Sequence, residues 1–286
     1  MKEILFHTII HTIEETIKLV PFLFIAFLII EFIEHKLSKK NEKVLKESGK
    51  FGPLLGSLLG LIPQCGFSVL ATNLYITRII SLGSLISIYL TTSDEMLIIL
   101  IADKAPFSLI ATILVLKFII GIVCGYIIDF VYRKKESLHE HIHDLCDKDE
   151  CHCEHENIYY SAFKHTIKTT VFILVSLFII NLIFHNFGEA YLSKLLLKNK
   201  FISPLVSSLI ALIPSCASSV IITELFLLEQ ISFGTLISGL LTNSGIAIML
   251  LFKNNKNLKE NITILLTIYI IGIISGILIN LISTII

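Results

Sequence analysis

Long apolar runs are the feature that most limits what this chain can fold into. A run of about 18 or more apolar residues is long enough to cross the hydrocarbon core of a bilayer. The chain has 286 residues, 54% of them hydrophobic, and a mean hydropathy of +0.83. Because its runs are apolar on all sides, the sequence predicts an all-α, polytopic membrane protein. The runs lie at 17–34, 52–80, 82–101, 107–132, 168–187, 203–228, 232–252 and 262–286.

The charged residues exclude one class of partner and indicate an orientation. The formal net charge is +0, which offers no basic surface for a nucleic acid. Lysines gather at 36–50, 194–200 and 253–259. Because loops rich in Lys and Arg tend to lie in the cytoplasm, we predict a multi-pass protein of the cell's inner (cytoplasmic) membrane with these loops on the cytoplasmic side.

The chain is also an internal duplication. When the sequence is shifted by 151 positions, Pro63 aligns with Pro214, and 22 of the 48 positions between 53 and 100 are identical. A repeat that fills nearly the whole chain predicts two homologous halves of four to five transmembrane segments each. We place membrane repeat 1 at 1–135, a polar linker at 136–160 and membrane repeat 2 at 161–286.

Each repeat carries a proline inside an apolar run, in "LIPQCGFSV" and in "LIPSCASSV". Pro63 and Pro214 cannot donate the helical hydrogen bond, so we predict a helix break with a new half-helix starting at or just after each proline. Cys65 and Cys216 would then lie in the first turn of those half-helices, where the helix dipole favours a thiolate or an anion. Broken helices at matching places in two repeats are typical of a transporter's central substrate site.

Two hydroxyl residues share one helical face with each cysteine. Cys65, Ser68 and Thr72 are spaced i, i+3 and i+7, and the second repeat has the same pattern. These faces could line one common pore, or the small side chains could simply pack between helices and bond to their own backbone. The predicted substrate-binding residues are Cys65, Cys216, Ser68, Ser219, Thr72, Thr223, Gln64 and Ser215.

The path of residues 51–80 decides how the repeats are related. One kinked helix makes the repeats parallel, whereas two short spans or a re-entrant hairpin make them inverted in the membrane. The lysine-rich loops at 36–50 and 194–200 share a sign, which weakly favours parallel repeats. The sequence leaves both arrangements open.

Two acidic residues interrupt an apolar span. Asp94 and Glu95 lie in "TTSDEM", where a charge costs roughly 2.5–3.5 kcal/mol at the bilayer centre. The second repeat has Gly245 and Ile246 at these positions. We therefore predict that Asp94 or Glu95 is a coupling carboxylate for a cation or proton; alternatively, the two acids lie at the edge of a water-filled cavity and pair with Arg78 or Lys104.

The linker is dense in metal-binding side chains, and imidazole and thiolate suit zinc, copper, nickel or cadmium. No zinc-finger spacing is present, so we predict a flexible chelating tether; the alternative is a solvated linker in which the histidines occur by chance. The candidate ligands are His139, His141, His143, Cys146, Cys151, His152, Cys153 and His155.

Several stretches of the chain resemble the ten-helix heavy-metal exporter family. They include "ETIKLVPFLFIAFLIIEFIEH", "GLIPQCGFSV", "TTSDEM", "LIPSCASSV" and the His-rich middle. Members of this family are described as arsenic efflux proteins or as manganese transporters. More distantly, the chain is similar to permeases that export organic arsenicals through helices bearing cysteines. The resemblance implies export of a metal or metalloid ion across the lipid bilayer.

Ligand chemistry narrows the expected substrate. Trivalent arsenic and cadmium prefer thiolates, whereas manganese prefers oxygen ligands, so Cys65 and Cys216 favour arsenite or a soft divalent metal, with manganese still compatible. No nucleotide-binding motif is present, so we expect a secondary transporter that is not an enzyme and uses no cofactor, and a homo-oligomer remains open. The alternative function is a membrane thiol-disulfide electron carrier in which Cys65 and Cys216 form and break a disulfide.

Overall fold

The structure is a computed structural model that describes residues 12–13, 16–17, 20–21, 23–25, 27–28, 51–63, 65–93, 96–132, 158–187 and 202–285. Within these residues it is built from helices and loops, and four helical stretches are long and apolar enough to cross a membrane. They are Leu82–Ala102, Phe107–Val131, Phe233–Asn254 and Leu258–Ser283. The predicted all-α membrane fold is therefore confirmed.

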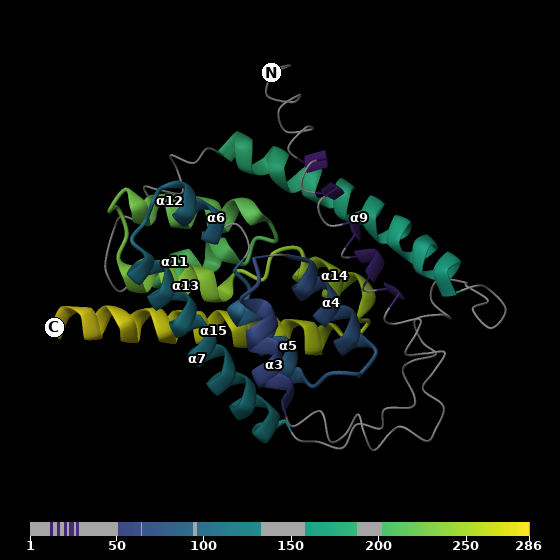
Figure 1. Cartoon of the computed structure of the whole chain (residues 1–286), viewed down its shortest axis with the longest axis horizontal. Helices are drawn as coiled ribbons and strands as arrows, with labels where there is room; N and C mark the ends of the chain where they lie inside the picture. The colour runs from purple at the N-terminus through teal and green to yellow at the C-terminus, as the bar shows by residue number, and fades with distance from the viewer. Residues whose placement is uncertain are drawn as a thin grey trace.

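The two repeats contain the same helices in the same order (Figure 1). In the second repeat, α12 and α13 have the bounds of α4 and α5 moved by 151 positions. A long helix, α9 (Ile158–Phe187), begins the second repeat. The first repeat contains α3 (Gly52–Gly60), α4 (Cys65–Ile76), α5 (Leu82–Thr91), α6 (Met96–Ala102) and α7 (Phe107–Val131), and the second contains α11 (Ile202–Ala211), α12 (Cys216–Leu227), α13 (Phe233–Thr242), α14 (Ala247–Asn254) and α15 (Leu258–Ile285).

The helix ends follow local sequence signals. The prolines lie in the short gaps between α3 and α4 and between α11 and α12, because proline removes a backbone donor and clashes with the preceding turn. Serines then cap the helices that follow: the Ser81 hydroxyl accepts a hydrogen bond from the Ser84 amide, and Ser232 caps α13 in the same way from Thr235. Such caps satisfy amides that the first helical turn leaves unpaired.

Helices α3 and α4 form a re-entrant hairpin. Gly52, at the start of α3, lies against Ser84 near the start of α5, and Gly60, at the end of α3, lies against Thr91 at the end of α5. Because α3 and α5 are therefore parallel, residues 52–82 leave one level of the membrane and return to it. The hairpin makes no net crossing.

Helices α5 and α6 form one broken span, and α7 returns beside it. Gly121 of α7 lies against Thr91 at the end of α5, and Gly125 lies against Gly83 near its start, so α5 and α7 are antiparallel. A Cβ on Gly125 would be 2.9 Å from the Gly83 carbonyl oxygen. This close approach of two backbones is the role predicted for small residues in membrane helix pairs.

The two repeats are inverted relative to each other. The loop before α5 contacts Asp129 near the end of α7, since the Ser81 hydroxyl donates to the Asp129 carboxylate at 2.7 Å. The same loop contacts the start of α15, where Arg78 pairs with Glu260 at 2.7 Å. This loop therefore lies at the C-terminal end of α7 and at the N-terminal end of α15, the equivalent helix of the second repeat. Figure 1 shows α7 and α15 running in opposite senses. The weak preference for parallel repeats drawn from the lysine loops is not what the structure has.

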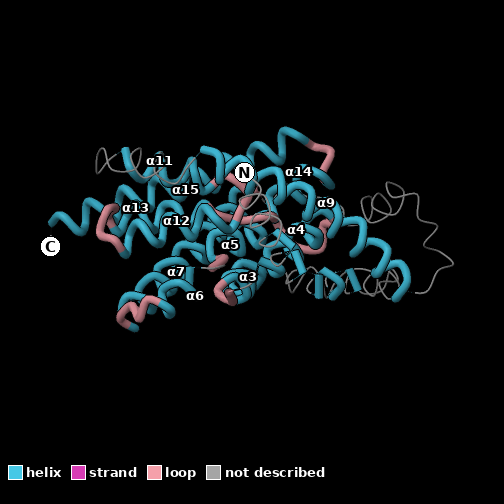
Figure 2. The backbone as a smooth tube through the Cα atoms, turned by 90° about the horizontal axis from the view of Figure 1, so that it is seen from above, coloured by secondary structure: helices cyan, strands magenta, loops and turns pink. Residues whose placement is uncertain are grey.

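The broken spans lie inside the protein and the long helices lie outside. The apolar 18-residue stretches of α5–α6 and α13–α14 are 69% and 89% buried, whereas the equivalent stretches of α7 and α15 are each 22% buried. Across the repeats, α4 packs against α14 (Figure 2), α12 packs against α6, and α5 contacts α13. This reciprocal packing is what a two-fold relation between the repeats requires.

Candidate functional site

The four helix breaks lie near the middle of the membrane. Helix α5 has ten residues, or about 15 Å at 1.5 Å per residue, which is half of the roughly 30 Å hydrocarbon core. Since α3 runs beside α5 over the same levels, the break after Gly60 lies at the depth of the break after Thr91. In the second repeat, Thr242 lies against Gly272, the equivalent of Gly121. The helix ends of both repeats therefore meet at mid-depth.

The two predicted cysteine ligands begin helices that start at this depth. Cys65 is the first residue of α4 and Cys216 is the first residue of α12, so both backbones lie where a helix offers unpaired amides. The placement of their side chains lies outside what the structure describes, as does all of Gln64. Ser215 is described: it caps α12, and its buried hydroxyl accepts from the Ala217 amide at 3.2 Å.

The predicted hydroxyl ligands are buried and largely bonded within the protein. The Thr72 hydroxyl donates to the Ser68 carbonyl oxygen at 2.7 Å and also pairs with the Tyr89 hydroxyl at 2.6 Å. The Thr223 hydroxyl donates to the Ser219 carbonyl at 2.7 Å. These bonds to the preceding turn are the packing role that threonine often has in membrane helices.

The predicted coupling carboxylates Asp94 and Glu95 lie outside the described residues. The equivalent turn in the second repeat is described. There, Gly245 has φ 56° and its amide donates to the Asn243 side chain at 3.1 Å. Glycine adopts this left-handed conformation without the steric penalty of a side chain, so in the second repeat this position makes the turn between α13 and α14.

A buried lysine that the sequence analysis did not select lies at the centre. The side chain of Lys117, on α7, is 0% exposed. Its ammonium donates to the Thr92 carbonyl at the end of α5 and, at 3.1 Å, to the Leu240 carbonyl near the end of α13. One side chain thus joins the C-terminal ends of both broken helices, which carry unpaired carbonyls and partial negative charge.

Two signals in the sequence could have identified this lysine. An ionisable residue within a membrane span is costly and is by default a candidate for function. Lys117 interrupts the apolar stretch "LVLKFIIG", and its equivalent in the second repeat is Ile268. Like Asp94 and Glu95, it is a charged residue that only the first repeat carries.

Ser244 provides a further polar group at the break between α13 and α14. It is 0% exposed, and its hydroxyl has no hydrogen-bond partner among the described residues. Its equivalent, Ser93, instead donates to the Thr91 carbonyl at 3.0 Å. A buried hydroxyl without a partner is uncommon and marks a position where a water or an ion can bind.

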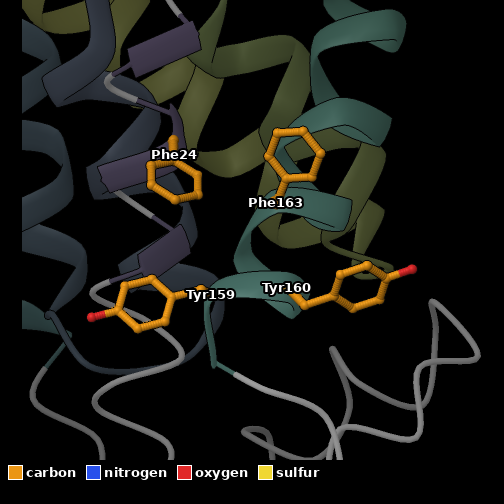
Figure 3. A pocket seen from close by; sticks show the side chains of 4 residues that line it. All are labelled: Phe24, Tyr159, Tyr160 and Phe163. Carbon is orange, nitrogen blue, oxygen red and sulfur yellow. The ribbon is translucent and has the colours of Figure 1, made fainter.

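The predicted chelating linker, with all eight of its His and Cys candidates, lies outside the described residues. Within the described ranges, no three His, Cys, Asp or Glu side chains come together as a metal site would require. A shallow aromatic groove lies elsewhere, between residues 23–25 and the start of α9, and is lined by Phe24, Tyr159, Tyr160 and Phe163 (Figure 3). It offers no charged group to an ion.

Comparison with known families gives a match over most of the chain. The family is described as "Putative, 10TM heavy-metal exporter", and it matches residues 5–184 and, in a second overlapping segment, residues 159–285. The chain belongs to this family. Neither the curated proteins nor the solved structures give a match.

The ten segments of the heavy-metal exporter family fit the observed repeats. The second repeat begins with a long helix, α9, and each repeat has two hairpin helices, one broken span and one outer helix, so the second repeat has five apolar segments. In the first repeat, the first of these is described only in short pieces between 12 and 28. Ten segments therefore correspond to fewer than ten membrane crossings, because α3–α4 and α11–α12 are hairpins.

Proposed function

We propose that this heavy-metal exporter is a secondary transporter of arsenite or a soft divalent metal, whose path passes between the four helix breaks. The observation that carries the proposal is the start of α4 at Cys65 and of α12 at Cys216, at the depth where both broken spans are interrupted. Two thiols from inverted repeats at one depth would supply two soft ligands to a thiophilic ion.

Ligand type supports soft ions over manganese. Thiolate sulfur suits trivalent arsenic, cadmium and zinc, whereas manganese prefers carboxylate and carbonyl oxygens. A helix N-terminus favours a thiolate through its unpaired amides and its dipole, so the first turn of a half-helix suits a metal-binding cysteine. Ser215 and the unpaired hydroxyl of Ser244 add oxygen donors near the breaks.

The energy source and orientation form part of the same proposal. Asp94 or Glu95 carries the coupling proton, because an acid in the middle of a span is costly unless it serves such a step. The cytoplasm lies on the side of Arg78, Lys253 and Lys256, because Lys and Arg mark cytoplasmic loops. Helix α7 ends on the same side, and in the sequence it is followed directly by Arg133, Lys134 and Lys135. Basic residues on the cytoplasmic side are what we expect for a protein of the inner membrane.

The test measures metal transport by cysteine variants in inside-out membrane vesicles. We expect wild type to accumulate arsenite or cadmium under an imposed pH gradient, and Cys65→Ser or Cys216→Ser to lose most of that uptake. Cys124→Ser is the matched control: this thiol is half-buried on the outer helix α7, and Ser275 replaces it in the second repeat. Full uptake by both central variants would show that the sulfur atoms are not ligands.

The same variants discriminate the thiol-disulfide alternative. An electron carrier that cycles between a Cys65–Cys216 disulfide and two thiols would exchange with a reduced thioredoxin and would transport no metal. An exporter would take up metal into the vesicles and would not exchange thiols with thioredoxin. A growth panel with arsenite, cadmium, zinc and manganese, using a deletion strain complemented by each variant, then identifies the substrate.

A further inference from the structure

The broken helices create an electrostatic requirement at the centre of the bilayer. The last carbonyls of α5 and α13 have no partner within their own helices, and the helix dipoles add partial negative charge there. Hydrocarbon offers these oxygens no water, so each needs a donor or a cation from the protein or its ligands. In many secondary transporters, half-helix C-termini of this kind bind the coupling cation.

Lys117 supplies that cation from within the chain. Its ammonium reaches the Thr92 and Leu240 carbonyls from a third helix, and its side chain is completely buried. An ammonium has three donors and a full positive charge, so it serves carbonyl oxygens as a monovalent metal ion does.

Comparison of the repeats shows that only the first has a lysine at this position. By the shift of 151, the equivalents of Lys117, Thr92 and Leu240 are Ile268, Asn243 and Tyr89. Ile268 is 0% exposed and apolar, so the second repeat has no charged side chain at the equivalent position. The lysine therefore adds a fixed charge that departs from the two-fold relation of the repeats.

We infer that the Lys117 ammonium is a tethered substitute for a coupling metal cation at the meeting of the two broken helices, so that this chain binds and requires neither Na⁺ nor K⁺ there. The inference extends the proposed function, because it limits the coupling ion to one that acts elsewhere, such as a proton on a carboxylate. The binding claim does not depend on which metal is exported.

The first test measures the melting temperature of the purified full-length chain in choline, sodium or potassium chloride at equal ionic strength. We expect wild type to melt at the same temperature in all three salts. Lys117→Ala should melt roughly 5–10 °C lower, because two buried carbonyls lose their donor, and methylammonium should restore part of that loss in a saturable way, since it fits the vacated position and choline does not.

Two matched variants separate the cation from the volume of the side chain. Ile268→Ala makes a cavity at the equivalent position of the second repeat, and we expect no specific recovery with methylammonium. Lys117→Met removes the charge but fills the space, and it should also show no recovery. A Lys117→Ala protein that responds equally to choline and methylammonium would overturn the inference. If Lys117→Ala does not fold, wild type alone decides, because saturable stabilisation by Na⁺ or K⁺ overturns it.

Metal-uptake assays in vesicles test this inference separately from the proposed function. Wild-type uptake of cadmium should be the same when choline replaces all Na⁺ and K⁺. A requirement for either ion would overturn the role of Lys117 while leaving metal export intact. Absence of uptake for every metal would instead contradict the proposed export, and the melting temperatures would still decide whether Lys117 takes the place of a cation.

Discussion

Arg78 of the first repeat forms a two-point ion pair with Glu260 of the second. The guanidinium nitrogens lie 2.7 and 3.0 Å from the two carboxylate oxygens, and Tyr75 and Asn255 also donate to Glu260. Arg78 adopts a left-handed backbone with φ 59°. The pair joins the hairpin loop of one repeat to the outer helix of the other, on the side of the membrane where α7 ends.

Breaking this ion pair should destabilise the contact between the repeats. The two side chains are only 15% and 16% exposed, so solvent screens them little, and we expect a coupling energy of about 1–3 kcal/mol. A double-mutant cycle of Arg78→Ala and Glu260→Gln, followed by thermal unfolding in detergent, measures it. Glu229→Gln is the matched control, because Glu229 is the exposed equivalent of Arg78 in the other repeat; a cycle that gives no coupling contradicts the prediction.

Alanine at the close helix contacts should be poorly tolerated. A Cβ on Gly125 would lie 2.9 Å from the Gly83 carbonyl oxygen, and backbone cannot rotate away as a side chain can. We expect Gly125→Ala to lose about 1–3 kcal/mol through overpacking, and Gly276→Ala to behave similarly in the second repeat. Thermal unfolding checks both, with Cys124→Ala as the neighbouring control; equal stability of Gly125→Ala and wild type would show that α7 can shift.

The two predicted threonine ligands should differ when replaced by valine. Thr72 bonds to the Tyr89 hydroxyl on another helix as well as to its own helix, whereas Thr223 bonds to its own helix. Thr72→Val therefore leaves the buried Tyr89 hydroxyl without this partner and should lose about 1 kcal/mol more than Thr223→Val. Tyr89→Phe in the Thr72→Val background should recover part of the difference in melting temperature, and no recovery would argue against the pair.

Neutral versions of the core acids should separate transport from its driving force. If Asp94 or Glu95 carries the coupling proton, then Asp94→Asn or Glu95→Gln stops uptake driven by a pH gradient. The same variant should still exchange labelled for unlabelled substrate across the membrane, because the thiol ligands remain. Vesicle assays with and without the gradient measure both reactions, and gradient-driven uptake in both variants would exclude these carboxylates.

The linker should affect metal capture and leave the helices unchanged. Replacing its five histidines and three cysteines with serine removes imidazole and thiolate ligands that bind zinc and cadmium. We expect fewer metal ions bound per purified chain and a higher substrate concentration for half-maximal uptake. The melting temperature without metal should not change; a large fall would instead indicate a structural role for the linker.

The sequence predicted the helix breaks better than the path between them. Proline chemistry is local, so Pro63 and Pro214 identify the breaks without knowledge of the fold. The hairpin depends on the close approach of α3 and α5, where Gly52 meets Ser84 and Gly60 meets Thr91. That pairing is tertiary, and the apolar pattern of 52–80 fits a kinked helix or a hairpin equally well.

For the candidate site, comparison of the repeats was more informative than the search for known ligand types. The search favoured Thr72 and Thr223, whose hydroxyls bond within the protein. Ligand chemistry gives no reason to select Lys117, because an ammonium group is not a ligand for a soft metal. The charge difference between Lys117 and Ile268 was visible in the sequence, but the carbonyls that the ammonium reaches belong to α5 and α13 and become adjacent only after folding.

The single central lysine also bears on how such a chain can have arisen. An ancestor with one repeat per polypeptide would pair as an antiparallel homodimer, and every residue would then occur twice around the axis. A lysine at position 117 would bring two ammonium groups into the same low-dielectric interior, where like charges repel strongly. Joining two gene copies removes that constraint, since one copy can keep the positive charge while the other takes the isoleucine seen at 268.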